Sequence, residues 1–406
     1  SRHHDDRELS VSHAPLLQAD EACALLLAAC RPLPSERVAP GPAVVGRVLA
    51  EPVGAAVDLP PFPSSAMDGY AVRAADARVP LPIAFRAAAG EDPPRLPQGH
   101  AAGITTGGVV PEGADAVVPV ERATERDGLV HFDGDVAPGD HVREIGSDLR
   151  RGAEVLPAGV PLVPLALAAL SAAGIAEIAV HLRPRVAVVV TGDELRTPPE
   201  PLRRGQIYES NGSFLAARSR ALGAELVGIE RVADDAEATR DAFERALETA
   251  DLVLASGGVS VGPHDHVKPA LRALGVRELF WRIALQPGKP AWAGELDGRL
   301  VVALPGNPLS VLAGYELLVR PALGRLSGLR QPVPTRLRLP LSEPARRLSD
   351  RMRAVPSVLE GSSVRPLGAG LSHQLGRAAL ADALALLPAG GADAPAGELV
   401  DVLSLA

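Results

Sequence analysis

The sequence predicts a multidomain protein of α/β plus β architecture, in which a central α/β domain with a parallel sheet is flanked by β-rich parts. Its 406 residues are too many for a single hydrophobic core. Apolar strands and amphipathic helices alternate through residues 184–328, as in parallel sheets that helices cover on both faces. On either side of this region, frequent Gly and Pro residues divide the chain into short segments typical of β-strands.

The N-terminal part is expected to begin with a helix and to continue as β structure. Residues 14–31 have the apolar spacing of an amphipathic helix, and residues 41–147 switch to short alternating segments. The apolar stretch 161–182 contains Gly174 and Glu177, so we interpret it as a core helix followed by a strand. We therefore expect no membrane-spanning segment.

The central region alternates regularly between strands and helices. The buried strand 185–190 ends in TGDEL, and helices are expected over 211–224 and after the acidic pair Asp234 and Asp235. Two further strands, DLVLA and LVVAL, lead into the turns SGGVSVG and LPGNPLS. Because ligands of such sheets bind beyond the carboxyl ends of the strands, these turns mark the expected site.

Residues 329–406 return to β character and predict a small barrel or sandwich, with Arg-Leu-Arg-Leu alternation typical of a half-exposed strand. The net charge of −8 and the lack of a basic tract argue against a nucleic-acid partner. No Walker A loop, HExxH or CxxC pattern occurs, so P-loop and zinc hydrolase chemistry have no support. The only cysteines, Cys23 and Cys30, lie on one face of the first helix and fit a reducing cytoplasm.

Four residues stand out because their types are rare in this chain. Among 41 Lys and Arg residues only Lys268 and Lys289 are lysine, and Asn211 and Asn307 are the only asparagines. A codon bias against lysine and asparagine, with these four residues retained by chance, would explain them. We favour the alternative that these positions need a compact ammonium or an amide, since all four lie in or beside turns that contain Gly or Pro.

The glycine-rich turns have two interpretations each. SGGVSVG is either an ordinary tight turn or a site where bare backbone N–H groups meet an oxyanion. In LPGNPLS, Asn307 and Pro308 suit a helix start and need no ligand, although the same N–H groups would hold a phosphate. Asp265 and Lys268, three residues apart, are either a surface ion pair or part of the site.

Acidic residues are spread over separate segments. Asp68, Asp148, Glu194 and Asp234 belong to SAMDGYAV, GSDLRRG, TGDEL and VADDAE. Carboxylates scattered in this way are usually solvated. If they converge in the fold, they provide the oxygen ligands that Mg²⁺ prefers.

Seven motifs in order resemble the molybdopterin molybdenumtransferase family, which is related to the C-terminal domain of gephyrin. They are LPPFPSSAMDGYAVR, TTGGVVPEGADAVV, VTGDEL, GQIYESNG, ASGGVSVGPHDHVK, QPGKP and LPGNPLS, and the resemblance runs from about residue 14 to 403. The chain departs from the family pattern at Pro63, Gly103 and Gln286. The changes at Gly103 and Gln286 remove positive charge near the proposed anion site.

The resemblance implies four domains and an elongated homodimer. Residues 1–50 with 148–183 would form a discontinuous linker domain, and 51–147 an inserted β-rich domain. Residues 184–328 would form the molybdopterin-binding α/β domain, and 329–406 a β-barrel-like C-terminal domain. Each site would lie between the α/β domain of one subunit and the N-terminal domains of the other.

The reaction implied is the insertion of molybdate into adenylylated molybdopterin, with release of AMP, by a Mg²⁺-dependent transferase. Lysines, glycine amides and turn residues would hold the anionic groups, and carboxylates would hold Mg²⁺ and orient the oxyanions. The implied catalytic residues are Asp68, Thr106, Glu194, Asp234, Asp265 and Lys268. The implied metal ligands are Asp68, Asp148, Glu194 and Asp265, and the implied binding residues are Gly257, Gly258, Ser260, Lys289, Pro305, Gly306, Asn307 and Ser310.

Three alternatives remain open from the sequence. The adenylylating enzyme of the same pathway has a similar α/β domain, but this chain carries about 180 residues before that domain. A non-enzymatic scaffold, and a paralogue that handles tungstate or is inactive, are the others. The adenylyltransferase that supplies the pterin and apo-molybdoenzymes that accept the cofactor are expected partners.

Overall fold

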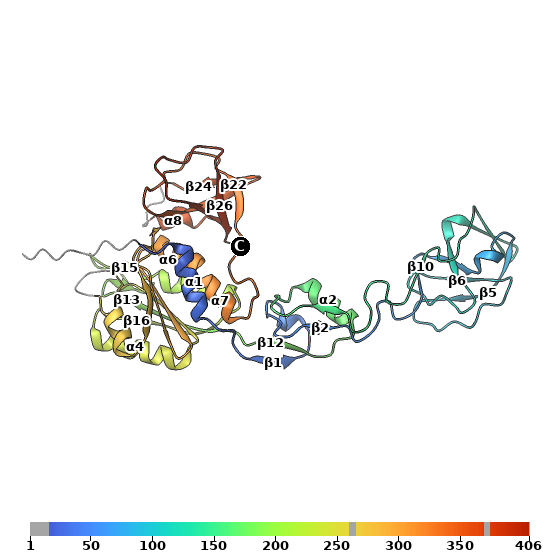
Figure 1. Cartoon of the computed structure of the whole chain (residues 1–406), viewed down its shortest axis with the longest axis horizontal. Coiled ribbons are helices and arrows are strands. Elements are labelled where there is room, and N and C mark those ends of the chain that lie inside the picture. The colour runs from blue at the N-terminus through green and yellow to red at the C-terminus, as the bar shows by residue number, and fades with distance from the viewer. Residues whose placement is uncertain (1–15, 260–264, 369–373, 406) are drawn as a thin grey trace, which may run out of the picture. The chain divides into compact units, whose positions relative to one another are not determined.

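The computed structural model describes residues 16–259, 265–368 and 374–405, and confirms the expected multidomain α/β and β organisation (Figure 1). The chain separates into two compact units. One consists of Arg37–Val45 and Leu49–Val180, and the remaining residues form the other. Within the described ranges no helix is both long enough and apolar enough to cross a membrane.

The first unit contains a small helical core around α2 (Pro164–Ala172). Pro164 occupies the first helical turn, where its missing N–H is not needed. The buried side chains Leu49, Leu162, Leu170 and Val180 pack together here. Two short strands, β2 (Val53–Gly54) and β11 (Glu154–Leu156), pair antiparallel beside them.

The same unit contains a six-stranded sheet with the order β7-β4-β6-β5-β9-β8. Asp127 and Gly128 join β8 to β9 with φ values of 53° and 78°, as in a type I′ hairpin turn. The strands are β4 (Gly69–Val72), β5 (Leu81–Ala87), β6 (Ala101–Ile104), β7 (Ala116–Pro119), β8 (Ala123–Arg126) and β9 (Leu129–Phe132).

The second unit is built on a six-stranded sheet with the order β16-β13-β17-β21-β20-β18. The first four strands are parallel, as expected, but β20 and β18 run antiparallel and make the sheet mixed. Asp297 and Gly298 cause this reversal, since their φ values of 49° and 83° form another type I′ turn. The strands are β13 (Arg185–Thr191), β16 (Glu225–Val232), β17 (Leu252–Ser256), β18 (Arg277–Trp281), β20 (Trp292–Leu296) and β21 (Arg299–Leu304).

Helices cover both faces of this sheet (Figure 1). Val186, Val188 and Val190 of β13 face a core that includes side chains of α1, α3, α6 and α7, whereas Ala187 and Val189 face α4 and α5. Alternation of this kind explains the uninterrupted apolar strand. The helices are α1 (Ala19–Ala29), α3 (Asn211–Ala221), α4 (Ala236–Thr249), α5 (Val267–Ala273), α6 (Pro308–Gly314) and α7 (Arg320–Leu326), with a π-helical turn, Tyr315–Val319, between the last two.

The C-terminal part forms a separate β-sheet within the second unit, with the order β19-β23-β25-β26-β22 and β24 paired to β23. Its core includes Val355, Ala385 and Val402. The short helix α8 (Leu375–Ala378) precedes β25. The strands are β19 (Leu285–Gln286), β22 (Leu337–Pro340), β23 (Met352–Glu360), β24 (Ser363–Pro366), β25 (Ala383–Leu387) and β26 (Leu399–Ser404).

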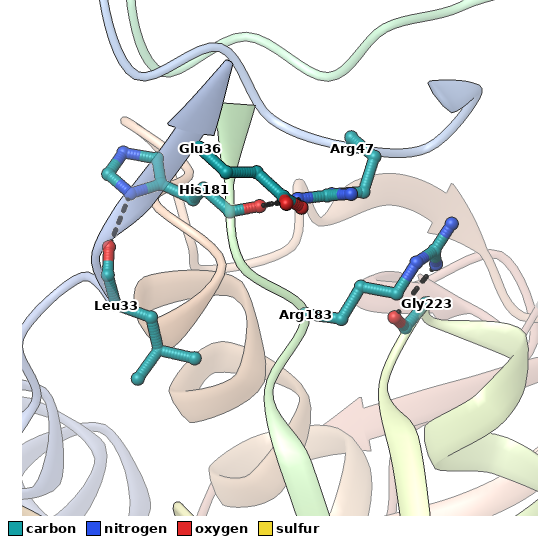
Figure 2. A network of polar contacts seen from close by, with 6 residues as sticks. All are labelled: Leu33, Glu36, Arg47, His181, Arg183 and Gly223. Atoms are coloured by element: carbon teal, nitrogen blue, oxygen red, sulfur yellow. Dashed lines mark hydrogen bonds and ion pairs between the residues drawn. The ribbon is translucent and has the colours of Figure 1, made fainter. Parts of the chain in front are cut away.

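A polar network ties together segments of the second unit that are far apart in sequence (Figure 2). Arg47 donates from Nε and Nη2 to the carbonyl oxygen of His181 at 3.0 and 2.7 Å, and pairs with Glu36 at 2.6 Å. His181 Nδ1 lies 2.6 Å from the carbonyl oxygen of Leu33. Arg183 donates to the carbonyl oxygen of Gly223 at 3.0 Å. The contacts of Arg47 and His181 hold together the segments around Leu33, Arg47 and His181, and Arg183 connects the last of these to the turn between α3 and β16.

Candidate functional site

A cavity of about 360 Å³ opens at the carboxyl ends of the parallel strands. Thr191 ends β13 and Ser256 ends β17, and both line it. This is the edge at which the sequence placed the site. The fold brings six of the expected residues to the cavity wall: Glu194, Asp234, Gly257, Gly258, Asp265 and Gly306.

Gly257 and Gly258 form the turn after β17, and both are required sterically. Their φ values are 93° and 63°. A Cβ atom on Gly257 would lie 2.7 Å from the carbonyl oxygen of Thr191, and one on Gly258 would lie 2.5 Å from Val267 Cγ2. The turn therefore needs glycine for its own geometry, and at the same time it leaves bare backbone on the cavity wall.

Asp234 is held in place by an exchange of hydrogen bonds with the TGDEL loop. The N–H of Asp193 donates to Asp234 Oδ2 at 3.3 Å, and the N–H of Asp234 donates to Asp193 Oδ1 at 3.1 Å. Glu194 follows directly in the same loop. The carboxylates of Glu194 and Asp234 thus approach the cavity from the loops that follow β13 and β16.

Asp265 and Lys268 form a buried pair, not the exposed ion pair that their spacing also allowed. Asp265 Oδ2 lies 3.8 Å from Lys268 Nζ, and the side chains are only 7% and 13% exposed. Burial raises the pKa of Asp265 to about 6, against the opposing effects of Lys268 and His266. Burial also lowers the pKa of Lys268, although Asp265 opposes this shift. Neither oxygen of the Asp265 carboxyl has a hydrogen-bond partner within the described residues.

Lys268 is not among the described residues that line the cavity. Its Nζ lies 3.6 Å from the centre of the Trp281 ring, and the guanidinium carbon of Arg282 lies 4.2 Å from the same centre. Both cations are therefore within range of a cation–π interaction with this ring. No local sequence pattern indicated Trp281 as a site residue, because its contact with Lys268 joins two separate elements, α5 and the end of β18.

Asn211 is a cavity residue that the site prediction left out. Its Nδ2 donates to Ser256 Oγ at 2.9 Å and to the carbonyl oxygen of Gly306 at 2.7 Å. It thereby ties the start of α3 to the last residue of β17 and to the turn after β21. The rarity of asparagine in this chain was a signal that could have identified it.

The turn between β21 and α6 contributes Gly306 and Pro308 to the cavity. Asn307 stands at the N-cap position, as expected, but its side chain makes no cap hydrogen bond. Ser310 is buried in α6, Pro305 follows β21, and Lys289 is exposed in the turn after β19. None of Lys289, Pro305, Asn307 and Ser310 is among the described lining residues. Ser260 lies outside the described residues.

The first unit has a separate cavity of about 530 Å³ beside Asp68. Asp68 Oδ1 accepts hydrogen bonds from the N–H and the hydroxyl of Thr106, at 2.6 and 2.9 Å. These bonds, the backbone one first, lower the pKa of Asp68. Asp68 and Thr106, both expected as site residues, are thus in direct contact, but Thr106 is not among the described residues that line this cavity. Asp148, whose N–H donates to the carbonyl oxygen of Leu59 at 3.0 Å, is not among the described residues that line this cavity.

Within the described ranges no three His, Cys, Asp or Glu side chains gather closely enough to hold a metal ion by themselves. Mg²⁺, however, commonly uses one or two carboxylates together with water and substrate phosphates. The buried Asp265 carboxyl on the cavity wall is compatible with that mode of binding.

Comparison with known proteins gives a consistent result along the chain. Residues 17–174 match the MoeA N-terminal region (domain I and II), 187–325 a probable molybdopterin binding domain, and 338–405 the MoeA C-terminal region (domain IV). Molybdopterin molybdenumtransferase 2 of Mycobacterium tuberculosis is 40% identical over 320 residues, which cover 76% of this chain and 78% of the relative.

A further relative and a solved structure agree. Molybdopterin molybdenumtransferase of Staphylococcus aureus is 30% identical and covers 88% of this chain and 88% of its own length. The crystal structure of the molybdopterin biosynthesis MoeA protein from Pyrococcus horikoshii matches with a TM-score of 0.83 at 28% identity. That match covers 96% of this chain and 100% of the other.

Proposed function

The chain belongs to the molybdopterin molybdenumtransferase family, and on this premise we propose that it inserts molybdate into adenylylated molybdopterin and releases AMP. At the coarser level it is a transferase of molybdenum cofactor biosynthesis. The observation that carries the finer proposal is the cavity at the ends of β13 and β17. It combines the bare glycines of one turn with four acidic residues, Glu194, Glu209, Asp234 and Asp265, inside the domain that matches a molybdopterin-binding family model.

The glycine-rich turns would bind the anionic parts of the substrate. The N–H of Gly257 donates to the carbonyl oxygen of Leu304 at 3.0 Å, so the N–H groups of Gly258 and Gly306 would be the donors that approach phosphate or dithiolene. Lys289 and Lys268 would add positive charge. Ser260, Pro305, Asn307 and Ser310 remain proposed members of the same binding region.

The carboxylates would divide into orienting and metal-binding roles. Glu194, Asp234 and Asp265 share one cavity, and Asp68 with Thr106 belongs to the other unit. Asp68, Asp148, Glu194 and Asp265 are the proposed ligands of Mg²⁺, which would supply charge that offsets the phosphate oxygens during cleavage of the anhydride to AMP. Residues of both units would act on one substrate within a homodimer whose sites are shared between subunits.

The free, buried thiols of Cys23 and Cys30 support a reducing compartment, so we place the enzyme in the cytoplasm. The adenylyltransferase that makes its substrate and the apo-molybdoenzymes that take its product are the partners we propose. Sedimentation analysis tests the homodimer, and a monomer at micromolar concentration would contradict shared sites.

Molybdate-dependent release of AMP from molybdopterin-AMP tests the reaction. The purified chain should release AMP only when molybdate and Mg²⁺ are present. Asp68→Ala and Asp265→Ala should each abolish release. Glu112→Ala and Asp241→Ala replace carboxylates outside the cavity linings and should keep it. Tight binding of the pterin without AMP release in the unaltered protein would contradict the proposal and indicate a scaffold or an inactive paralogue.

A further inference from the structure

Tyr70, Gly103 and Arg86 occupy directly opposed positions on three neighbouring strands. Tyr70 of β4 pairs with Gly103 of β6 in the antiparallel ladder, and Arg86 of β5 pairs with Gly103 in the parallel ladder. Residues that stand opposite one another in a sheet project from the same face. Gly103 therefore leaves a gap on that face between the Tyr70 and Arg86 side chains.

The side chain of Arg86 fills the gap above Gly103. A Cβ atom on Gly103 would lie 2.9 Å from Arg86 Cγ and 3.1 Å from Arg86 Nη1, and its three nearest atoms would all belong to Arg86. The guanidinium carbon lies 5.9 Å from the centre of the Tyr70 ring. Glycine at position 103 is thus what allows Arg86 to extend along the sheet toward Tyr70.

Glu125 belongs to β8, the edge strand two places from β5 in the sheet order, and it holds this arrangement. Its Oε2 accepts hydrogen bonds from Arg86 Nη2 and, at 2.9 Å, from the Tyr70 hydroxyl. The hydrogen bond to Glu125, and secondarily the one to Tyr70, raises the pKa of Arg86, so the guanidinium stays charged. A guanidinium has five N–H donors, and Glu125 takes only one side of the group.

Arg86 and Gly103 line the same cavity as Asp68. Among the described lining residues, Arg86 is the cation, whereas Asp68 and Glu91 are anions. An oxyanion that enters this cavity meets two carboxylates and needs a positive partner to offset their repulsion. The positive charge that the sequence lacks at position 103 is present in the fold at Arg86.

We propose that Arg86 binds a tetrahedral oxyanion of the substrate in this cavity, next to Asp68. The oxyanion is either molybdate itself or the phosphate of the adenylylated pterin, and both present oxygen acceptors to a planar guanidinium. The inference rests on the proposed function, because that function supplies the anionic substrate. Tyr70 and Glu125 act as positioning residues that hold the guanidinium over Gly103.

Replacing the charge at position 86 tests the proposal. Arg86→Ala should raise KM at least about tenfold, the loss expected for one charge-assisted hydrogen bond, while kcat changes less. Arg95→Ala removes a comparable exposed arginine, which pairs with Glu112 at 3.5 Å outside this cavity, and should leave KM unchanged. Calorimetric titration of the full chain with molybdate alone and with AMP alone shows which oxyanion depends on Arg86.

A sharper test moves the arginine from β5 to the neighbouring strand β6. Gly103 has an ordinary backbone conformation, and only Arg86 crowds its Cβ position. Arg86→Ala combined with Gly103→Arg should therefore restore most of the lost binding, whereas Gly103→Arg alone should weaken it. If Arg86→Ala does not fold, Arg86→Gln keeps a donor toward Glu125 without the charge and replaces it.

This pair of measurements distinguishes a failure of the role proposed for Arg86 from a failure of the proposed function. Unchanged titrations with both molybdate and AMP in a folded Arg86→Ala variant would overturn the role of Arg86, whatever the unaltered protein catalyses. Absence of AMP release from the unaltered protein would instead contradict the proposed function, and the titrations would still decide whether Arg86 holds an oxyanion.

Discussion

Lys268 Nζ lies closer to the centre of the Trp281 ring, at 3.6 Å, than to Asp265 Oδ2, at 3.8 Å. The ammonium is largely withdrawn from water, since its side chain is 13% exposed. Attraction to the Asp265 carboxylate offsets part of the cost of removing the ammonium from water. The face of the Trp281 ring adds a cation–π attraction.

Substitution of Trp281 should separate this attraction from simple packing. We expect Trp281→Leu to lower kcat for AMP release about 2- to 30-fold, because a cation–π contact contributes about 0.5 kcal/mol when exposed and about 2 kcal/mol when desolvated. Trp281→Phe keeps an aromatic face and should retain most of the activity. Steady-state kinetics at saturating molybdate checks this, and equal losses in the Phe and Leu variants would count against a role for the π face.

The buried carboxylate of Glu316 should be a large contributor to stability. Its side chain is fully buried and accepts hydrogen bonds from Arg218 at 2.8 Å and Arg320 at 3.0 Å. Glu316→Gln would leave two guanidinium groups without their counter-charge, so we expect a loss of about 3–5 kcal/mol in the free energy of unfolding.

The matched control for Glu316 is an exposed pair. Glu230 and Arg245 lie on the surface, with side chains 42% and 59% exposed. Glu230→Gln should cost less than about 1 kcal/mol, since exposed ion pairs are screened by solvent. Urea titrations of both variants, followed by circular dichroism, measure the difference, and comparable midpoints would refute the assignment of Glu316.

The thiols of Cys23 and Cys30 should be unreactive in the folded protein. Burial raises the pKa of Cys23 to about 11 and that of Cys30 to about 12. The thiolate is the reactive form, so iodoacetamide at pH 8 should label neither cysteine until denaturant is added. Mass spectrometry gives the result, and rapid labelling of the native chain would show that helix α1 opens.

The same pKa shifts predict how stability changes in alkali. Because the folded pKa values lie above the ordinary value of 9.0, the contribution of the protonated thiols is complete below pH 9. It is lost as the pH rises toward 11 and 12. Cys23→Ala and Cys30→Ala together should flatten this decline between pH 9 and 11 in urea titrations, and an unaltered decline would assign it to other groups.

The turn that reverses β20 should depend on the backbone of Gly298. Its φ is 83°, and a Cβ atom there would meet nothing within 4 Å. Gly298→Ala should therefore cost about 1 kcal/mol through backbone strain alone. Gly228→Ala in β16 is the control, since that glycine has equal space and an ordinary φ. Similar thermal midpoints for the two variants would contradict the role of the turn.

Much of the fold follows from local sequence patterns. Buried apolar segments identified β13, β17 and β21, and Asp235 marked the start of α4, where its side chain accepts from the N–H of Ala238 at 2.8 Å. Strand periodicity and helix caps are settled by residues close together in the chain. The antiparallel edge was missed, although the Asp297–Gly298 pair is a hairpin signal that could have indicated it.

The same distinction between local sequence patterns and tertiary contacts applies to the candidate site. The sequence by itself placed Glu194, Gly257, Gly258 and Gly306 at the ends of strands, because turns after parallel strands share one edge of the sheet. Only the tertiary structure shows that Lys268 packs on Trp281 and that Arg86 fills the gap at Gly103. Burial and cross-strand contacts join residues that no local pattern relates, and they decide which charges are withdrawn from water and which remain available to a ligand.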